Sequence, residues 1–329
     1  MMSFTEVRRQ QFLTENYYLK SREYHEEGIP LYLESDAYED DEYNCGEASR
    51  WQSITLTYWD LLLLGYTSGE AIEELLPLFE NIIVGYTKQA EALAVFKGTV
   101  KPSVINGEGG FIALSMISLA VLLNQKKMLS TIKELINGEN EDQTGEDEVI
   151  NKFLKILDPK HPNTNNDGVY SYDYSPLCDV IDSALDKDDK DHALEVLDNY
   201  LLDWYGIHKN TLWYNSHLDL DNGFSYVGYW AFEVAFLVYM LDLDDTSLHK
   251  YLYYPKDIVQ WIRNNKKEND IELNFEKIKV LAGDVSPKSG YWYNIVKEKS
   301  RQYFNQGEVL PKIKDQDWGE VYWYWDGEK

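Results

Sequence analysis

One carboxylate interrupts an apolar stretch of the chain. Glu233 stands between Phe232 and Val234 in the segment GYWAFEVAFLVYM, which is apolar on nearly every face of a helix. Such a helix is normally buried, and a buried carboxylate must find a partner, keep its proton or face a cleft. The first two outcomes are structural, and the third would be functional. Arg50, beside Trp51 in an N-terminal helical segment, is the cation that we expect to pair with Glu233.

Paired carboxylates among aromatic side chains also suit an enzyme. The chain contains 10 Trp and 26 Tyr, enough to line a sugar-binding cleft, and two facing carboxyl groups are the acid and base of glycoside hydrolysis. In a chain with 57 acidic residues, however, such pairs of carboxylates arise by chance. A helical-toroid glycoside hydrolase or a carbohydrate-binding protein therefore stays open as the alternative, with no residue assigned to catalysis.

No motif for a metal, a nucleophile or a bound phosphate occurs in the sequence. The six histidines form neither an HExxH motif nor close pairs with cysteines, the patterns that hold zinc. The GxSxG elbow, a GxGxxG fingerprint after a strand and the P-loop are missing too. The GEGG stretch at 107–110 is too short and too acidic to cradle phosphate. We therefore expect no metal, no cofactor and no enzymatic activity.

The charge of the chain favours a basic partner. Its 57 acidic and 31 basic residues leave a formal charge of -26, which repels nucleic acid and anionic membranes and attracts basic molecules. Direct nucleic-acid binding is therefore not expected. The two cysteines form no disulfide framework, the N-terminal residues lack a signal peptide, and the longest apolar run, 111–123, is shorter than the roughly 20 residues that span a bilayer. These features predict a cytoplasmic protein without a membrane span.

Apolar periodicity near 3.6 residues predicts a predominantly all-α fold, a multi-helix bundle followed by a small β-containing tail. A first long helix begins near Phe4 and ends at Gly28 and Pro30, and two segments, 48–67 and 68–96, should pair as a helical hairpin. The pattern divides the chain into a helical region over 1–136, an acidic, turn-rich linker with a short helix over 137–168, a second helical region over 169–265, and a Trp- and Tyr-rich tail with short strands over 266–329.

A shift of 118 residues aligns two separate parts of the chain. It places Asn81 of PLFENIIVGY on Asn199 of EVLDNYLLDW, and Gly110 of GGFIALSMISLA on Gly228 of VGYWAFEVAFLV. Because one shift serves both segments, we expect an internal repeat of helical hairpins.

Residues 228–263 combine GYWAFE, then DLDD, then YYPKDI before a Trp-containing helix. This string resembles the C-terminal signature of the PoNi-type immunity proteins, and RRQQFLTENYY and WDLLLLGYTSG are similar to the other half of that family. The resemblance covers roughly the first 265 residues. It implies an intracellular, all-helical protein that binds and neutralises a cognate secreted PoNe-type DNase toxin and carries no catalysis of its own.

Seven residues of the signature match the family pattern, namely Gly228, Tyr229, Trp230, Glu233, Tyr254, Pro255 and Asp257. For Trp230 and Glu233 we expect a fold-holding role, because buried aromatic rings and hydrogen-bonded buried carboxylates are mostly structural. The signature is therefore expected to maintain the fold, and the partner is expected to bind beside it.

The preferred partner-binding segment is HLDLDNGFSY, which immediately precedes the signature. It contains Asp219, Asp221 and Tyr226, with Tyr229 close behind. Aromatic side chains flanked by acids suit a binding hot spot with a charged rim, so Tyr226 and Tyr229 are the expected anchors.

A second acidic cluster, Asp40, Asp41 and Glu42, lies in a tract without basic residues over 34–47. Charge runs are usually solvated loops, so it ranks below the first cluster as a partner-binding site. Either cluster could occupy the basic groove that a nuclease presents to DNA phosphates.

Overall fold

The computed structural model describes residues 3–37, 39–42, 44–105, 110–141, 147–161, 174–265, 279–294, 300–312 and 322–327. The chain divides into two compact units, Met1–Leu273 and Asn274–Lys329. The first unit is helical and the second contains a small sheet. The predicted class, predominantly all-α with a small β-containing C-terminal part, is confirmed.

The N-terminal helix is shorter at its start and longer at its end than predicted. A short helix α1 (Phe4–Val7) is separated from α2 (Glu15–Glu34), which begins where the Thr14 hydroxyl accepts a hydrogen bond from the Tyr17 N–H. The helix continues through Pro30, so the expected stop at Gly28 and Pro30 is wrong. Proline removes one backbone donor, but residues 29–34 are exposed or half-exposed, so water can satisfy the carbonyl oxygen that loses its partner.

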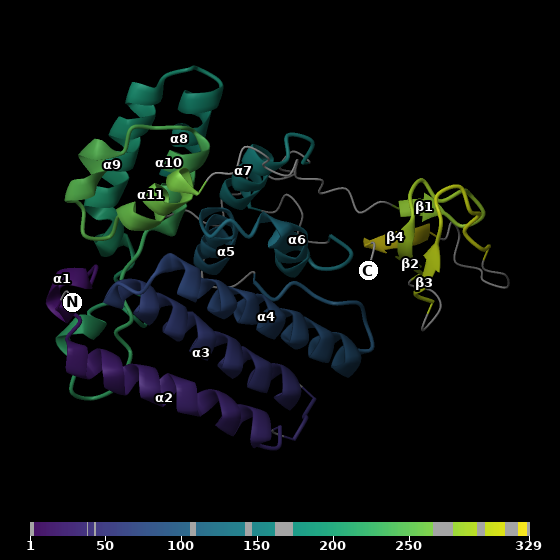
Figure 1. Ribbon diagram of the computed structural model, residues 1–329, viewed down its shortest axis with the longest axis horizontal. Helices are drawn as coiled ribbons and strands as arrows, with labels where there is room; N and C mark the ends of the chain where they lie inside the picture. The colour runs from purple at the N-terminus through teal and green to yellow at the C-terminus, as the bar shows by residue number, and fades with distance from the viewer. Residues whose placement is uncertain are drawn as a thin grey trace. The chain divides into compact units, whose positions relative to one another are not determined.

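Three long helices lie side by side in the first unit (Figure 1). Helix α3 (Gly46–Ser68) packs on α2 and also on α4 (Leu76–Lys97), which follows a 3-10 turn, η1 (Ile72–Leu75). Gly69 ends α3 in the left-handed conformation, φ +94°, which glycine adopts without steric cost. The predicted hairpin of the two segments is confirmed.

The core of this unit is built around two nearly all-apolar helices. Helix α5 (Phe111–Leu122) packs on α10 (Phe232–Met240), and every residue from Ala113 to Leu122 is buried. Helices α6 (Leu129–Asn137) and α7 (Glu148–Leu157) also pack on α5. The short 3-10 turn η3 (Lys126–Met128) leads into α6.

The segment predicted as a linker over 137–168 contributes to this core. Its short helix is α7, whose Phe153 stacks on Phe236 of α10 with ring centroids 4.8 Å apart. Residues 142–146 and 162–173, on either side of α7, lie outside the described residues.

A second hairpin, α8 (Pro176–Leu185) and α9 (Lys190–Ile207), precedes α10. The 3-10 turns η5 (Ser216–Leu218) and η6 (Thr246–Lys250) flank α10, and α11 (Lys256–Asn264) packs back on it. A hairpin followed by a buried helix thus occurs twice, as α3–α4 with α5 and as α8–α9 with α10 (Figure 1). This order agrees with the expected internal repeat, which stays a prediction.

The second unit contains strands β1 (Lys279–Leu281), β2 (Gly290–Tyr293), β3 (Gln302–Phe304) and β4 (Tyr322–Gly327). They form one antiparallel sheet in the order β1-β4-β2-β3. Its small core consists of Trp292, Phe304, Leu310 and Trp323. Within the parts of the chain that the structure describes, no helix has the length and apolar character needed to cross a bilayer.

Candidate functional site

Glu233 lies inside the core, with 1% of its surface exposed. Its Oε1 accepts hydrogen bonds from the Trp204 indole N–H at 2.7 Å and from the Tyr200 hydroxyl at 3.0 Å, both on α9. Burial raises the pKa of Glu233 to about 7, and the hydrogen bonds partly offset this effect. The carboxyl group therefore joins α10 to α9 and does not face a cleft.

Arg50 is not the partner of Glu233, so that prediction is wrong. The Arg50 guanidinium lies near the start of α3, where it donates to Glu47 at 2.8 Å and to the Ser35 carbonyl oxygen at 2.8 Å. Glu47 is one helical turn away from Arg50, a spacing at which side chains on a helix surface meet. Both side chains stay partly exposed, so the pair remains hydrated. Glu233 needs no cation, because two uncharged donors meet one of its oxygens and its raised pKa favours the neutral form.

A buried glutamine ties the N-terminus of the chain to the signature. Gln10 has no exposed surface, and its Oε1 accepts from the Tyr226 hydroxyl at 2.8 Å and from the Tyr229 N–H at 3.1 Å. Its Nε2 donates to the Tyr229 carbonyl at 2.6 Å and, at 3.3 Å, to that of Leu252. No sequence pattern singles out Gln10, since RRQQ reads as an exposed polar run.

The neighbouring arginine makes a second link to the signature. Arg9 Nε donates to Asp257 at 2.9 Å, and its Nη1 donates to the carbonyl oxygens of Tyr66 and Glu70 at 2.6 and 3.0 Å. The guanidinium also lies 4.4 Å from the centre of the Tyr66 ring. Asp257, in the first turn of α11 after buried Pro255, thus pairs within the fold.

Two further signature residues make internal hydrogen bonds. The Tyr254 hydroxyl donates to Asp245 at 2.6 Å, and Asp245 also accepts from Arg263 at 2.7 Å. The Trp230 indole N–H donates to the Thr67 hydroxyl oxygen at 2.9 Å. These contacts agree with a fold-holding role for the signature, which stays a prediction.

Gly228 lies where no other residue fits. Its φ is +120°, and an added Cβ would overlap the Thr67 hydroxyl oxygen. The same Thr67 donates to the Val227 carbonyl oxygen at 2.6 Å. The chain therefore crosses the end of α3 at close range just before α10.

Tyr226 and Tyr229 are buried, so the prediction that they anchor a partner is wrong. Tyr226 is held by Gln10 and by Tyr17, whose hydroxyl accepts from the Tyr226 N–H at 3.0 Å. The Tyr229 hydroxyl accepts from the His217 N–H at 3.0 Å. Their polar groups have intramolecular partners and their rings have core contacts, which is why neither side chain reaches the surface.

The loop before them does reach the surface. In the segment 209–225, called here the 209–225 loop, Asp219 and Asp221 are exposed as expected. Two leucines that the sequence did not single out accompany them: Leu212 is 100% exposed and Leu218 is 72% exposed. Apolar side chains beside exposed carboxylates are therefore present, but they are leucines where tyrosines were expected.

The acidic cluster of Asp40, Asp41 and Glu42 is exposed, in agreement with a solvated loop. Asp40 accepts from the Gly46 N–H at 2.9 Å and Asp41 from the Asn44 N–H at 2.8 Å. Two of the three carboxylates thus also order the start of α3.

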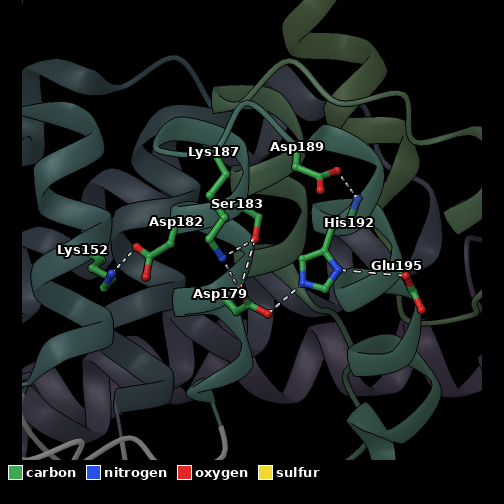
Figure 2. Close-up of polar contacts among 8 residues, drawn as sticks. All are labelled: Lys152, Asp179, Asp182, Ser183, Lys187, Asp189, His192 and Glu195. Carbon is green, nitrogen blue, oxygen red and sulfur yellow. Dashed lines mark hydrogen bonds and ion pairs between the residues drawn. The ribbon is translucent and has the colours of Figure 1, made fainter.

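A third acidic surface, which the sequence interpretation missed, lies at the turn between α8 and α9. We call it the α8–α9 corner, and its exposed carboxylates are Asp186, Asp188, Asp189, Asp191 and Glu195. Figure 2 shows His192 of α9 between Glu195 and Asp179 of α8, with Nε2 3.1 Å from Asp179. This contact lowers the pKa of Asp179. The run DKDDKD was the available signal in the sequence.

Ion pairs stabilise the same corner. Lys187 lies 3.4 Å from Asp179, and Lys152 of α7 pairs with Asp182 of α8 (Figure 2). Asp189 caps α9 by accepting from the His192 N–H at 3.0 Å. Ion pairs of Asp179 and Asp182 therefore stabilise the corner, and its exposed carboxylates give it a negative surface.

One pocket joins the N-terminal helices to the signature. Its volume is about 150 Å³, and we call it the aromatic pocket after its lining. The walls are Leu56, Trp59, Asp60, Leu63, Phe111, Ile112, Ser115, Trp204, Trp213, Ser225, Val227, Gly228, Tyr229, Trp230 and Phe232. Asp60 is the one carboxylate among them. Its side chain is 41% exposed, yet the surrounding apolar groups raise the pKa of its carboxyl group to about 7.

The described residues contain no cluster of three or more histidine, cysteine, aspartate or glutamate side chains arranged to hold a metal ion. What the geometry offers is a set of surfaces for binding: two acidic loops, the α8–α9 corner and the aromatic pocket.

Comparison with known proteins assigns part of this architecture. Residues 145–258 match the model of a family described as PoNe immunity proteins (PoNi), C-terminal. This segment is similar to the C-terminal domain of the PoNi proteins. The predicted family resemblance is thereby confirmed, and the matched segment includes the α8–α9 corner, the 209–225 loop and Glu233.

Much of the fold has a counterpart among solved structures. The crystal structure of protein PA2201 from Pseudomonas aeruginosa superposes with a TM-score of 0.59, covers 79% of this chain and 92% of that chain, and is 16% identical in sequence. At this identity the likeness shows the fold alone. No curated protein matches the chain.

Proposed function

We propose that this protein binds a cognate nuclease toxin and neutralises it by covering the toxin's DNA-binding groove with an acidic surface. The match of residues 145–258 to immunity proteins against PoNe is the observation that carries the proposal. The protein acts without catalysis of its own, in the cytoplasm, where the toxin meets DNA. Exposed carboxylates within the matched segment support this function.

Charge complementarity gives the proposal its mechanism. A nuclease must present basic side chains to DNA phosphates, and this chain carries a formal charge of -26. Opposite potentials accelerate the encounter of two proteins, and an acidic face seated in a basic groove excludes DNA from it. Neutralisation would then require no chemistry, only a complex that forms faster than DNA is cleaved.

The 209–225 loop is the face that we propose for this contact. Leu212 and Leu218 supply apolar anchors, and Asp219 and Asp221 supply the charged rim, the division of roles that strong protein interfaces use. Tyr226 is buried and supplies none of the exposed surface of this face.

Sequencing the neighbouring genes should identify a candidate cognate nuclease, and co-expression of that nuclease with this protein tests the function. Cells that express the nuclease should survive only when this protein is present. Survival that does not depend on the protein, or failure to find any nuclease partner, would refute the function.

Matched surface variants test the face. Asp219→Lys with Asp221→Lys should slow association with the nuclease at least tenfold, because exposed charges steer the encounter. Added salt should reduce the difference in association rate between variant and parent, since charges are screened over about 8 Å at physiological ionic strength. Leu212→Ser with Leu218→Ser should instead accelerate dissociation, because anchors mainly affect the lifetime of a complex.

Two control variants reverse charge elsewhere while sparing the capping carboxylates. Glu39→Lys with Glu42→Lys changes the acidic tract around Asp40 and Asp41, and Asp186→Lys with Glu195→Lys changes the α8–α9 corner. Both should associate faster than the 209–225 loop variant. If the α8–α9 corner variant is the slowest, the binding face lies on that corner and not on the loop.

A competition experiment separates two ways of neutralising the toxin. If the groove is covered, DNA and this protein should exclude each other from the nuclease. A ternary complex in which DNA stays bound but uncut would refute occlusion and leave the immunity function standing.

A further inference from the structure

The aromatic pocket contains a carboxylate that lacks a compensating charge. Among the described residues, Asp60 has no hydrogen bond, and the nearest potential cation is His25, whose Nδ1 lies 3.8 Å from Asp60 Oδ2. This distance is too long for a hydrogen bond. Burial lowers the pKa of His25, so its imidazole is neutral near pH 7 and leaves the carboxylate unbalanced. Asp60 also interacts electrostatically with Tyr17, whose phenol is uncharged and supplies no positive charge.

The rest of the pocket suits the body of one side chain. A cavity near 150 Å³ holds a group about the size of benzene. Four tryptophans, Trp59, Trp204, Trp213 and Trp230, line it together with aliphatic and phenylalanine side chains. Tryptophan rings attract cations, guanidinium groups in particular, while an aliphatic stem gains from apolar walls.

We propose that the aromatic pocket receives one arginine side chain of the protein partner, whose guanidinium group pairs with Asp60 while its stem lies against the tryptophans. This inference rests on the proposed function, because a DNA-binding nuclease is rich in exposed arginine and lysine. Ser225 and Trp213 of the proposed binding face also line the pocket, so one partner surface can contact both.

The proposal can be tested without the toxin. The probe is n-butylguanidinium, which reproduces the charged end and stem of arginine, and the matched neutral probe is n-butylurea. Binding is followed by the indole N–H signals of the tryptophans in a ¹⁵N-labelled sample of the full chain. Butylguanidinium should shift a subset of these signals saturably, at least tenfold more tightly than butylurea.

Asp60→Asn should weaken butylguanidinium binding at least tenfold, while Asp36→Asn, at an exposed carboxylate, should leave it unchanged. The Asp60 variant should fold, because asparagine removes an ionisation that burial disfavours; its melting temperature checks this. Equal binding of butylguanidinium to the parent and to Asp60→Asn would overturn the proposal. Equal binding of both probes would also overturn it, since the pocket would then be a site for uncharged apolar groups.

Failure of the pocket proposal and failure of the proposed immunity function give different results. If butylguanidinium binds through Asp60 and no nuclease partner exists, the pocket stands and the immunity function fails. If the nuclease complex forms with the same affinity for Asp60→Asn and Asp36→Asn, the immunity function stands and the pocket proposal fails.

Discussion

Replacing Glu233 by alanine should destabilise the helical unit, and more so at acidic than at alkaline pH. Its Oε1 accepts from the Tyr200 hydroxyl and the Trp204 indole N–H, and alanine leaves both buried donors unsatisfied. Each unsatisfied group costs about 1–3 kcal/mol, so the lost hydrogen bonds lower the free energy of unfolding by roughly 2–6 kcal/mol.

The same carboxyl group makes the stability of the parent depend on pH. Burial raises its pKa from 4.5 to about 7 in the folded protein. Between these values the unfolded chain has lost a proton that the folded chain still holds, so stability falls as pH rises through this window. From pH 5.5 to pH 8 the fall attributable to Glu233 is roughly 2 kcal/mol. Alanine cannot ionise, so its destabilising effect should shrink by that amount at pH 8.

Glu233→Gln separates hydrogen bonding from ionisation. The amide oxygen of the glutamine still accepts from both donors, and the amide does not ionise. The free energy of unfolding of this variant relative to the parent should therefore rise by roughly 2 kcal/mol between pH 5.5 and pH 8. Asp60, whose pKa is also raised, is present in every variant and cancels in the comparison. Urea unfolding followed by far-UV circular dichroism at both pH values measures these differences.

Two results would refute this reasoning about Glu233. The first is an alanine variant that unfolds at the parent's urea midpoint at pH 5.5. The second is a glutamine variant that keeps the parent's dependence on pH.

Three further outcomes follow from the structure. Gly228→Ala should lower the free energy of unfolding by about 2 kcal/mol or more, because φ is +120° and the added Cβ meets Thr67; urea unfolding at the parent's midpoint would contradict this. Gln10→Ala should lower the free energy of unfolding by about 2–4 kcal/mol, because it leaves the buried hydrogen-bonding groups of Tyr226 and Tyr229 without a partner. The control Gln11→Ala, at an exposed neighbour, should change the melting temperature little. The purified protein should hydrolyse no polysaccharide; turnover abolished by changing one carboxylate would instead support the glycoside hydrolase alternative.

The helical architecture could be predicted because apolar periodicity is a local property of the chain. The run 111–123 is apolar on every face, and it became the buried helix α5. Helix ends were harder to place: α2 starts after Thr14, because the chain before it leaves the helix and directs Arg9 and Gln10 inward toward the signature. This inward course depends on contacts with residues more than 200 positions away, which no local pattern encodes.

In the candidate site, too, local features could be predicted and long-range contacts could not. The burial of Glu233 could be predicted from its apolar neighbours, but its partners could not, because Tyr200 and Trp204 are brought to it by the α8–α9 hairpin. Tyr226 was expected at the surface because acidic residues precede it in its segment. A buried glutamine from the other end of the chain satisfies its hydroxyl and draws it inward.

Inhibition of DNA cleavage by the purified protein tests the immunity function most directly. The cognate nuclease, once it is identified, is held at a fixed concentration well above the dissociation constant of the complex, and this protein is titrated into the reaction. Cleavage should fall linearly to zero at one molecule per nuclease, and the association rate should decrease as salt rises. A nuclease that cleaves DNA at its full rate in the presence of a large excess of this protein would contradict the account.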